Sequence, residues 1–245
     1  MDYSYISENY KRISELIKEY IHLYNQQQIV ELLCVTKTYP AEAIIEAYSA
    51  GATFFGENRV QEALPKIIRF NELLRDKNLP IGMKNDVRWH MIGALQSNKV
   101  KKVLPVFSMI QSVDRTSLID ELVKQTQNSG LISDILIEVN SSSEPQKSGI
   151  NPSELYSLID YILENGRGRL KIKGLMTVGP LTDDEKKIEQ SFSLMQNLFN
   201  RLKLQYPDQS FPILSMGMSQ DFKLAIKWGS TMVRIGSLLF GERKY

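Results

Sequence analysis

The sequence predicts an α/β fold, a single closed (β/α)8 barrel of the TIM type with an extra helix at its N-terminus. Three observations lead to this prediction. Short apolar segments alternate with segments of helical periodicity, which is typical of parallel βα units. Eight apolar segments of this kind occur, and a length of 245 residues suits one barrel. A doubly wound open sheet is the alternative, and the count of eight favours the barrel.

The elements follow from apolar spacing along the chain. The expected strands are residues 30–36, 53–56, 87–93, 107–113, 134–139, 171–178, 212–216 and 232–236. The expected helices between them are 41–50, 58–75, 115–128, 153–164, 184–205 and 220–228, with a shorter element near 98–104 that ends at Pro105.

Residues 1–28 are expected to hold one long amphipathic helix packed on the barrel, because Ile13, Ile17 and Ile21 recur at helical spacing. Few residues follow the last strand, so this helix is expected to cover that part of the ring. No linker rich in proline, glycine or serine interrupts the chain, and residues 1–245 are therefore interpreted as one domain.

Composition excludes several classes of protein. The net charge is +2 and no sustained basic stripe occurs, which argues against a nucleic-acid partner. One cysteine excludes an internal disulfide, and two histidines give no metal-binding spacing. No apolar run reaches 18 residues and the N-terminus has no apolar core, so neither a membrane span nor a signal peptide is expected. The expected location is the cytoplasm.

The stretch LLCVTKTYP, residues 32–40, ends an apolar strand in lysine. Side chains alternate along a strand, so Leu33, Val35 and Lys37 share one face. A solvated strand tip is one explanation of Lys37. The other is a functional group at the barrel mouth, because active sites of such barrels lie at the carboxyl ends of the strands.

The last strand brings a second cation to the same mouth. Met232, Arg234 and Gly236 share a face, and barrel closure makes this strand a neighbour of the first. Two cations at close range repel each other, unless an anion lies between them or one of them is neutralised. Lysine is neutralised when it forms a Schiff base with a carbonyl compound.

Ser219, Gly236 and Ser237 follow strands seven and eight, which is the usual phosphate site of these barrels. Ser219 also stands where it could simply cap the helix expected to begin near Gln220. A phosphate at these residues, an aldehyde at Lys37 and Arg234 beneath a ring would together describe pyridoxal phosphate.

At this point the sequence resembles a known family, the pyridoxal phosphate homeostasis proteins. The matching stretches are CVTKTYP, FGENRVQE, WHMIGALQSNK, SVDR, EVNSSSEPQKSG, GLMTVGP and LSMGMSQDFKLAIKWGSTMVRIGSLLFG, which span residues 34–241 in order. The resemblance implies a barrel of the alanine racemase type, the type III fold of pyridoxal phosphate proteins, with the cofactor held as an internal aldimine.

By position, the resemblance implies eight cofactor-binding residues and no catalytic or metal-binding ones. Lys37 matches the Schiff-base lysine, Asn58 lies near the ring, and Arg234 contacts the pyridine nitrogen. Ser219, Gly236 and Ser237 hold the phosphate, and Met216 and Gly217 line the approach.

Other residues in these stretches keep simpler explanations. His90 is interpreted mainly as a histidine satisfied by local hydrogen bonds, with a direct catalytic role as the alternative. Thr36 and Thr38 flank the lysine and shape the turn. Glu57 and Arg59 could pair with each other at the mouth, and no role is assigned to them.

Arg234 also bears on mechanism. A guanidinium only donates hydrogen bonds and stays charged, so the ring nitrogen it contacts remains unprotonated, which makes the ring a weaker electron sink. Alanine racemases add a second domain with a catalytic tyrosine, for which this chain has no residues left. A non-catalytic monomer that buffers pyridoxal phosphate and delivers it to apo-enzymes is therefore favoured, with effects on amino-acid and keto-acid balance.

Two alternatives remain open. One is an enzyme of the racemase or decarboxylase kind, with low activity on a small amino acid. The other is a phosphate-binding barrel that uses Lys37 only as a charge.

Overall fold

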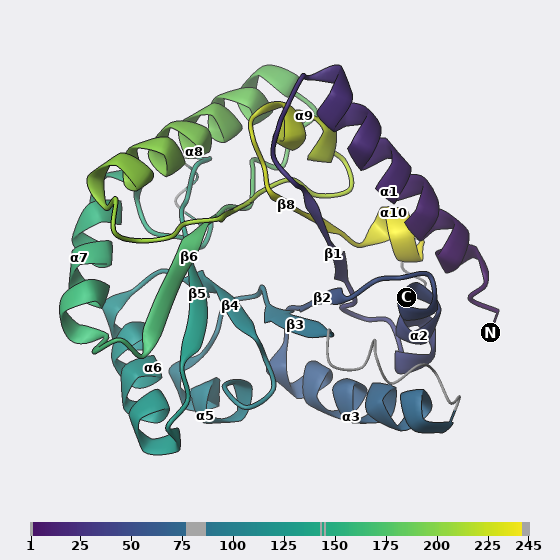
Figure 1. Cartoon of the computed structure of the whole chain (residues 1–245), viewed down its shortest axis with the longest axis horizontal. Helices are drawn as coiled ribbons and strands as arrows, with labels where there is room; N and C mark the ends of the chain where they lie inside the picture. The colour runs from purple at the N-terminus through teal and green to yellow at the C-terminus, as the bar shows by residue number, and fades with distance from the viewer. Residues whose placement is uncertain (1, 77–86, 143, 145, 242–245) are drawn as a thin grey trace.

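The computed structural model describes residues 2–76, 87–142, 144 and 146–241, and these form a closed parallel barrel in which each strand pairs with the next (Figure 1). The strands are β1 (Glu31–Val35), β2 (Phe54–Glu57), β3 (Arg88–Met91), β4 (Met109–Val113), β5 (Ser133–Glu138), β6 (Leu170–Met176), β7 (Ile213–Ser215) and β8 (Met232–Ile235). The predicted barrel is confirmed. Residues 143 and 145, within the EVNSSSEPQKSG stretch, lie outside the described residues.

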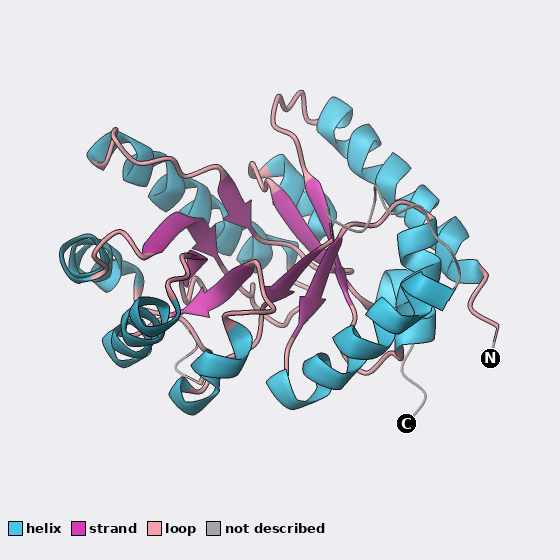
Figure 2. Ribbon diagram, turned by 60° about the horizontal axis from the view of Figure 1, so that its bottom comes forward, coloured by secondary structure: helices cyan, strands magenta, loops and turns pink. Residues whose placement is uncertain are grey.

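Helices surround the strands (Figure 2). They are α1 (Tyr5–Leu23), α2 (Ala41–Ser49), α3 (Val60–Asp76), α5 (Val100–Val103), α6 (Thr116–Ser129), α7 (Leu155–Asn165), α8 (Glu185–Gln205), α9 (Phe222–Lys227) and α10 (Ser237–Phe240), with short 3-10 turns η1 (Ser97–Lys99) and η2 (Pro152–Glu154). The element expected near 98–104 is therefore η1 followed by α5. None of the described helices is both long and apolar enough to cross a membrane.

Strand alternation explains the two layers of the core. Outward-facing residues such as Leu32 and Cys34 join the large cluster beneath the helices. Inside the barrel, Met109, Leu136 and Met176 form a small separate cluster.

The barrel closes between β1 and β8, where Leu33 is paired with Arg234. The two strands that carry the predicted cations are therefore neighbours, as expected from closure.

The N-terminal helix covers the part of the ring beside this seam, as predicted. Helix α1 contacts α2, α9 and α10. The hydroxyl of Tyr5 donates to the carbonyl of Phe240 at 2.7 Å, and the amide of Asn9 donates to the carbonyl of Leu239 at 3.0 Å. These bonds tie α1 to α10, the short helix that follows β8.

Candidate functional site

A cavity of about 530 Å³ opens at the carboxyl ends of the strands. Six of the eight predicted binding residues line it, namely Lys37, Asn58, Ser219, Arg234, Gly236 and Ser237. They come from the loops after β1, β2 and β7 and from β8 and the residues after it. The fold thus gathers lysine, arginine and hydroxyl groups from distant parts of the sequence around one space.

The other two predicted residues are not among the residues that line this cavity. Met216 is completely buried and belongs to the core beneath the helices. Gly217 has a φ of +92°, and a Cβ there would lie 2.4 Å from the Cβ of Ala225 in α9. Its carbonyl accepts the backbone N–H of Arg234 at 2.9 Å. Gly217 therefore lets α9 approach β8 closely, and it supports the wall from behind.

Arg234 is buried at the cavity floor and its guanidinium is held on two sides. Nη1 donates to the hydroxyl of Ser215 at 2.8 Å, and Nη2 donates to the carbonyl of Thr177 at 2.6 Å. Burial lowers the pKa of Arg234 to about 10, while the carboxylates of Asp221 and Glu138 act to raise it. The group remains a fixed positive charge near neutral pH.

A buried chain of hydrogen bonds runs from Arg234 to His90 across the barrel interior. The hydroxyl of Ser215 donates to Gln111 Oε1 at 2.8 Å, and Gln111 Nε2 donates to His90 Nδ1 at 2.8 Å. Burial, with a smaller effect from Arg88, lowers the pKa of His90 to about 3. His90 is therefore neutral with its proton on Nε2, and local hydrogen bonding is the role that its surroundings support.

Ser219 does not cap the helix that follows it, so the simpler explanation of this residue is wrong. Helix α9 begins at Phe222, and Asp221 rather than Ser219 precedes it. The oxygen of Ser219 instead accepts the backbone N–H groups of Gly236 and Leu238 at 3.4 and 3.3 Å. Two backbone donors after β8 thus converge beside a hydroxyl at the cavity wall.

Lys37 lies two residues beyond the end of β1 and is half-buried. The next residue, Thr38, has a φ of +70°, which is unusual for a β-branched side chain. The side chain of Thr36 points back into the protein, where its hydroxyl donates to Glu57 Oε1 at 2.6 Å. Glu57 is fully buried and pairs with Lys66 of α3 at 2.7 Å, not with Arg59.

Asn58 lies on the cavity wall and its Oδ1 atom is buried without a hydrogen-bond partner among the described residues. Behind it, Gly93 approaches so closely that a Cβ would lie 2.3 Å from the carbonyl oxygen of Asn58. This contact explains the glycine of the WHMIG stretch, since any larger residue would displace the backbone that carries Asn58.

Several cavity residues were not predicted from the sequence. These are Val35, Tyr39, Ile92, Lys147, the loop 178–182, Ile188, Met218, Gln220 and Asp221. Most lie in loops, for which hydrophobic periodicity gives no signal. Asp221 is the clearest omission, because burial raises its pKa against the opposing effects of the Met218 backbone N–H and Arg234.

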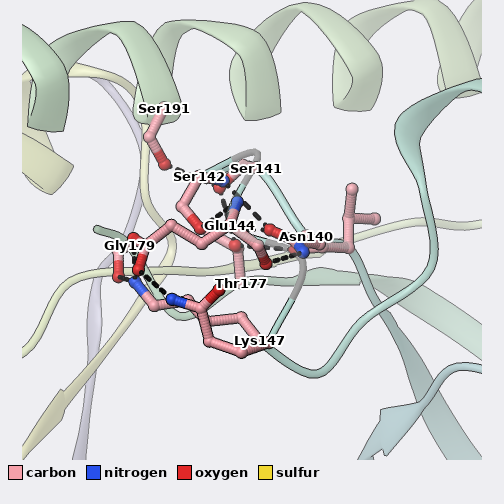
Figure 3. Close-up of polar contacts among 10 residues, drawn as sticks. Asn140, Ser141, Ser142, Glu144, Lys147, Thr177, Gly179 and Ser191 are labelled. Carbon is pink, nitrogen blue, oxygen red and sulfur yellow. Dashed lines mark hydrogen bonds and ion pairs between the residues drawn. The ribbon is translucent and has the colours of Figure 1, made fainter. Parts of the chain in front are cut away.

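Lys147 joins two loops at the mouth (Figure 3). Its Nζ atom donates to Glu144 Oε1 at 2.7 Å and to the carbonyl of Gly179 at 2.9 Å. Nearby, the hydroxyls of Ser141, Thr177 and Ser191 form a buried row with contacts of 2.7 and 2.6 Å. The loops after β5 and β6 are therefore fixed to each other on the side of the cavity opposite the β8–β1 seam.

Glu138, at the end of β5, is a buried carboxyl close to the same floor. Burial and the negative charge of Asp114 raise its pKa to about 7, against the opposing effect of Arg234. It does not line the cavity, and its charge state changes near neutral pH.

This barrel and its cavity define a protein of the alanine racemase type. The family described as "Alanine racemase, N-terminal domain" matches residues 2–244. A pyridoxal phosphate homeostasis protein of Pasteurella multocida (strain Pm70) is 41% identical over 241 residues, covering 98% of each chain. Its counterpart in Aquifex aeolicus (strain VF5) is 42% identical over 219 residues, 89% of this chain and 90% of the relative. The chain belongs to the pyridoxal phosphate homeostasis protein family.

Solved structures agree with this assignment. PipY of Synechococcus elongatus PCC7942, with pyridoxal phosphate bound, superposes with a TM-score of 0.79 at 33% identity, covering 96% of this chain and all of that one. Alanine racemase from Streptomyces coelicolor A3(2) superposes with a TM-score of 0.74 at 15% identity, covering 99% of this chain and 59% of the racemase. The second likeness shows the barrel fold alone.

Proposed function

We propose that this protein holds pyridoxal 5′-phosphate as an aldimine of Lys37 and delivers it to apo-enzymes, without catalysing a reaction of its own. In this proposal it works in the cytoplasm, as a monomer and as one domain. The observation that carries the proposal is the cavity that Lys37, Arg234 and Ser219 share. An amine, a fixed cation and a hydroxyl beside backbone donors match the aldehyde, ring nitrogen and phosphate of this cofactor.

The aldehyde end requires a nucleophilic amine. The neutral amine of Lys37 adds to the aldehyde carbon and, with loss of one water molecule, leaves a carbon–nitrogen double bond. Lys37 is half-buried and lines the same cavity as the buried Arg234, so its amine is placed where it could meet the aldehyde. Asn58 lines the cavity near the place proposed for the ring.

The phosphate end requires several hydrogen-bond donors. The hydroxyl of Ser219 and the residues Gly236 and Ser237, which line the cavity, would supply them. The backbone N–H groups of Gly236 and Leu238 donate to the Ser219 oxygen and hold this hydroxyl in place. Met216 and Gly217 do not line the cavity, and in this proposal they support its wall from behind rather than contact the cofactor.

Arg234 favours storage over catalysis. Its guanidinium is charged and donates only, so a ring nitrogen beside it accepts a hydrogen bond and stays unprotonated. An unprotonated ring withdraws electrons less strongly from a bound amino acid, and the carbanion needed for racemisation or decarboxylation is then poorly stabilised. The weak electron sink supports the role of a carrier that exchanges the cofactor with apo-enzymes. Amino-acid and keto-acid balance would depend on the enzymes that receive it.

The test is a transfer assay with the loaded protein. An apo-enzyme that requires pyridoxal phosphate is mixed with it, and the recovery of enzyme activity is timed against the release of cofactor into buffer. The proposal expects activity to recover faster than free release allows. Recovery limited by free release, or turnover of D- or L-amino acids at ordinary enzyme rates, would contradict it.

A further inference from the structure

Three charged side chains next to the turn that carries Lys37 form a cluster, in which two members are buried and one is partly exposed. We call Glu57, Glu62 and Lys66 the Lys66 cluster. Nζ of Lys66 lies 2.7 Å from both Glu57 Oε1 and Glu62 Oε1, and the side chains of Lys66 and Glu57 are only 8% and 0% exposed. None of the three lines the cavity. A buried ion pair of this kind contributes little net stability.

The cluster is hydrogen-bonded to the backbone on both sides of Lys37. Nζ of Lys66 donates to the carbonyl of Thr36 at 2.8 Å. Oε1 of Glu62 accepts the backbone N–H of Thr38 at 2.5 Å. The residue before Lys37 and the residue after it are thus both fixed to helix α3.

The conformation held in this way does not arise by itself. Thr38 adopts a φ of +70°, and this left-handed conformation is unfavourable for a residue with a Cβ. Thr38 is exposed, so packing of its own side chain does not hold it there. The hydrogen bond from its N–H to Glu62 is a direct restraint on this turn.

We propose that Glu62 and Lys66 are positioning residues that hold the β1–α2 turn so that the amine of Lys37 is presented to the cofactor. This inference rests on the proposed function of Lys37. Small displacements of a reacting group slow bond formation by large factors, so loosening the turn will slow adduct formation even though no contact with the cofactor is lost.

The test compares three variants. Glu62→Ala removes the acceptor of the Thr38 N–H, and Glu62→Gln keeps an oxygen in the same place. Arg69→Met is the matched control, since Arg69 lies on the same helix, is 49% exposed and pairs only with Glu42 and Glu72 in the described structure. Thermal unfolding is recorded for each variant, and Glu62 is partly exposed, which favours a folded product.

Two measurements follow on each variant. The first is hydrogen exchange of the Thr38 amide in cofactor-free protein. The second is the rate at which added pyridoxal phosphate forms its coloured adduct. We expect Glu62→Ala to lose protection at Thr38 and to form the adduct at least about tenfold more slowly. Glu62→Gln and Arg69→Met are expected to remain close to the unsubstituted protein in both.

An adduct rate in Glu62→Ala equal to that of Arg69→Met would overturn the inference, as would an unchanged Thr38 exchange rate. Equal slowing by Glu62→Gln and Glu62→Ala would also overturn it, because the acceptor oxygen would then be irrelevant. If the unsubstituted protein forms no adduct, the proposed function fails instead, and the exchange data alone decide whether Glu62 holds the turn.

Discussion

Ser215 lies between Arg234 and Gln111 and exchanges a hydrogen bond of 2.8 Å with each, accepting from the arginine and donating to the amide. The direction of these bonds is fixed because a guanidinium donates only. Arg234 is therefore oriented by a polar chain that starts at His90 on the opposite side of the barrel. The cavity floor is a hydrogen-bonded unit and not a single cation in an apolar wall.

Replacement of Ser215 tests this unit. Ser215→Ala leaves a buried N–H of Arg234 and the Oε1 atom of Gln111 without their partner. An unsatisfied buried polar group costs roughly 1–3 kcal/mol, so the free energy of unfolding is expected to fall by about that amount. Urea unfolding measures the change. Ser129→Ala, at the exposed end of α6, is the control. A loss no larger than that of Ser129→Ala would show that the chain contributes nothing.

The raised pKa of Glu138 leads us to expect that the stability of the protein depends on pH. The pKa of this carboxyl is raised from 4.5 in the unfolded chain to about 7 in the folded protein, chiefly by burial. Below pH 4.5 both states are protonated and the group has no effect. As pH rises towards 7 the unfolded state ionises first, so folding is progressively penalised, by roughly 3 kcal/mol above pH 7. Glu138→Gln is expected to remove this penalty.

The measurement for Glu138 is urea unfolding at pH 4.5 and at pH 8, values chosen from the two pKa values above. Relative to the unsubstituted protein, Glu138→Gln should gain stability at the higher pH and not at the lower one. Glu164→Gln, at an exposed position in α7, serves as the control for loss of a carboxylate. An equal effect of Glu138→Gln at both pH values would contradict the assignment.

Substitution of Gly93 tests whether its close contact with the Asn58 backbone holds Asn58 in place at the cavity wall. A methyl group at Gly93 would lie 2.3 Å from the Asn58 carbonyl oxygen, so Gly93→Ala must displace the backbone of Asn58. We expect a stability loss of about 1–3 kcal/mol, as for other overpacked sites, together with weaker cofactor binding. Gly130→Ala is the control, because an alanine at its φ of +72° would be strained while its surroundings are open. If both variants bind the cofactor equally, the contact does not shape the site.

His90 is expected to stay neutral over the whole physiological range. Burial lowers its pKa to about 3, whereas an unperturbed histidine titrates near pH 6.5. Nitrogen NMR of labelled protein between pH 5 and 8 should therefore show a single neutral ring with the proton on Nε2. A ring that gains a proton in this interval would reopen the catalytic role for His90.

The barrel and its two cations could be predicted because they depend on local periodicity. Alternation along β1 and β8 placed Lys37 and Arg234 on inner faces, and closure made the strands neighbours. The helical spacing of Ile13, Ile17 and Ile21 likewise predicted α1.

The ion-pair and hydrogen-bond partners of individual side chains could not be predicted, because they depend on how the helices pack against the loops. Glu57 pairs with Lys66, nine residues away on α3, rather than with the nearer Arg59. Ser219 is bonded to backbone N–H groups after β8 rather than to its own helix. Met216 and Gly217 belong to a matching stretch, yet they support the wall from behind.

The most direct measurement of the central claim locates the covalent bond. The protein is loaded with pyridoxal phosphate, reduced with borohydride, digested and analysed by peptide mass spectrometry, with Lys37→Ala and the exposed-lysine control Lys101→Ala in parallel. The account predicts one dominant modified peptide, carrying the cofactor on Lys37, in the unsubstituted protein and in Lys101→Ala but not in Lys37→Ala. A loaded protein whose cofactor is reduced onto another lysine, or onto none, would contradict it.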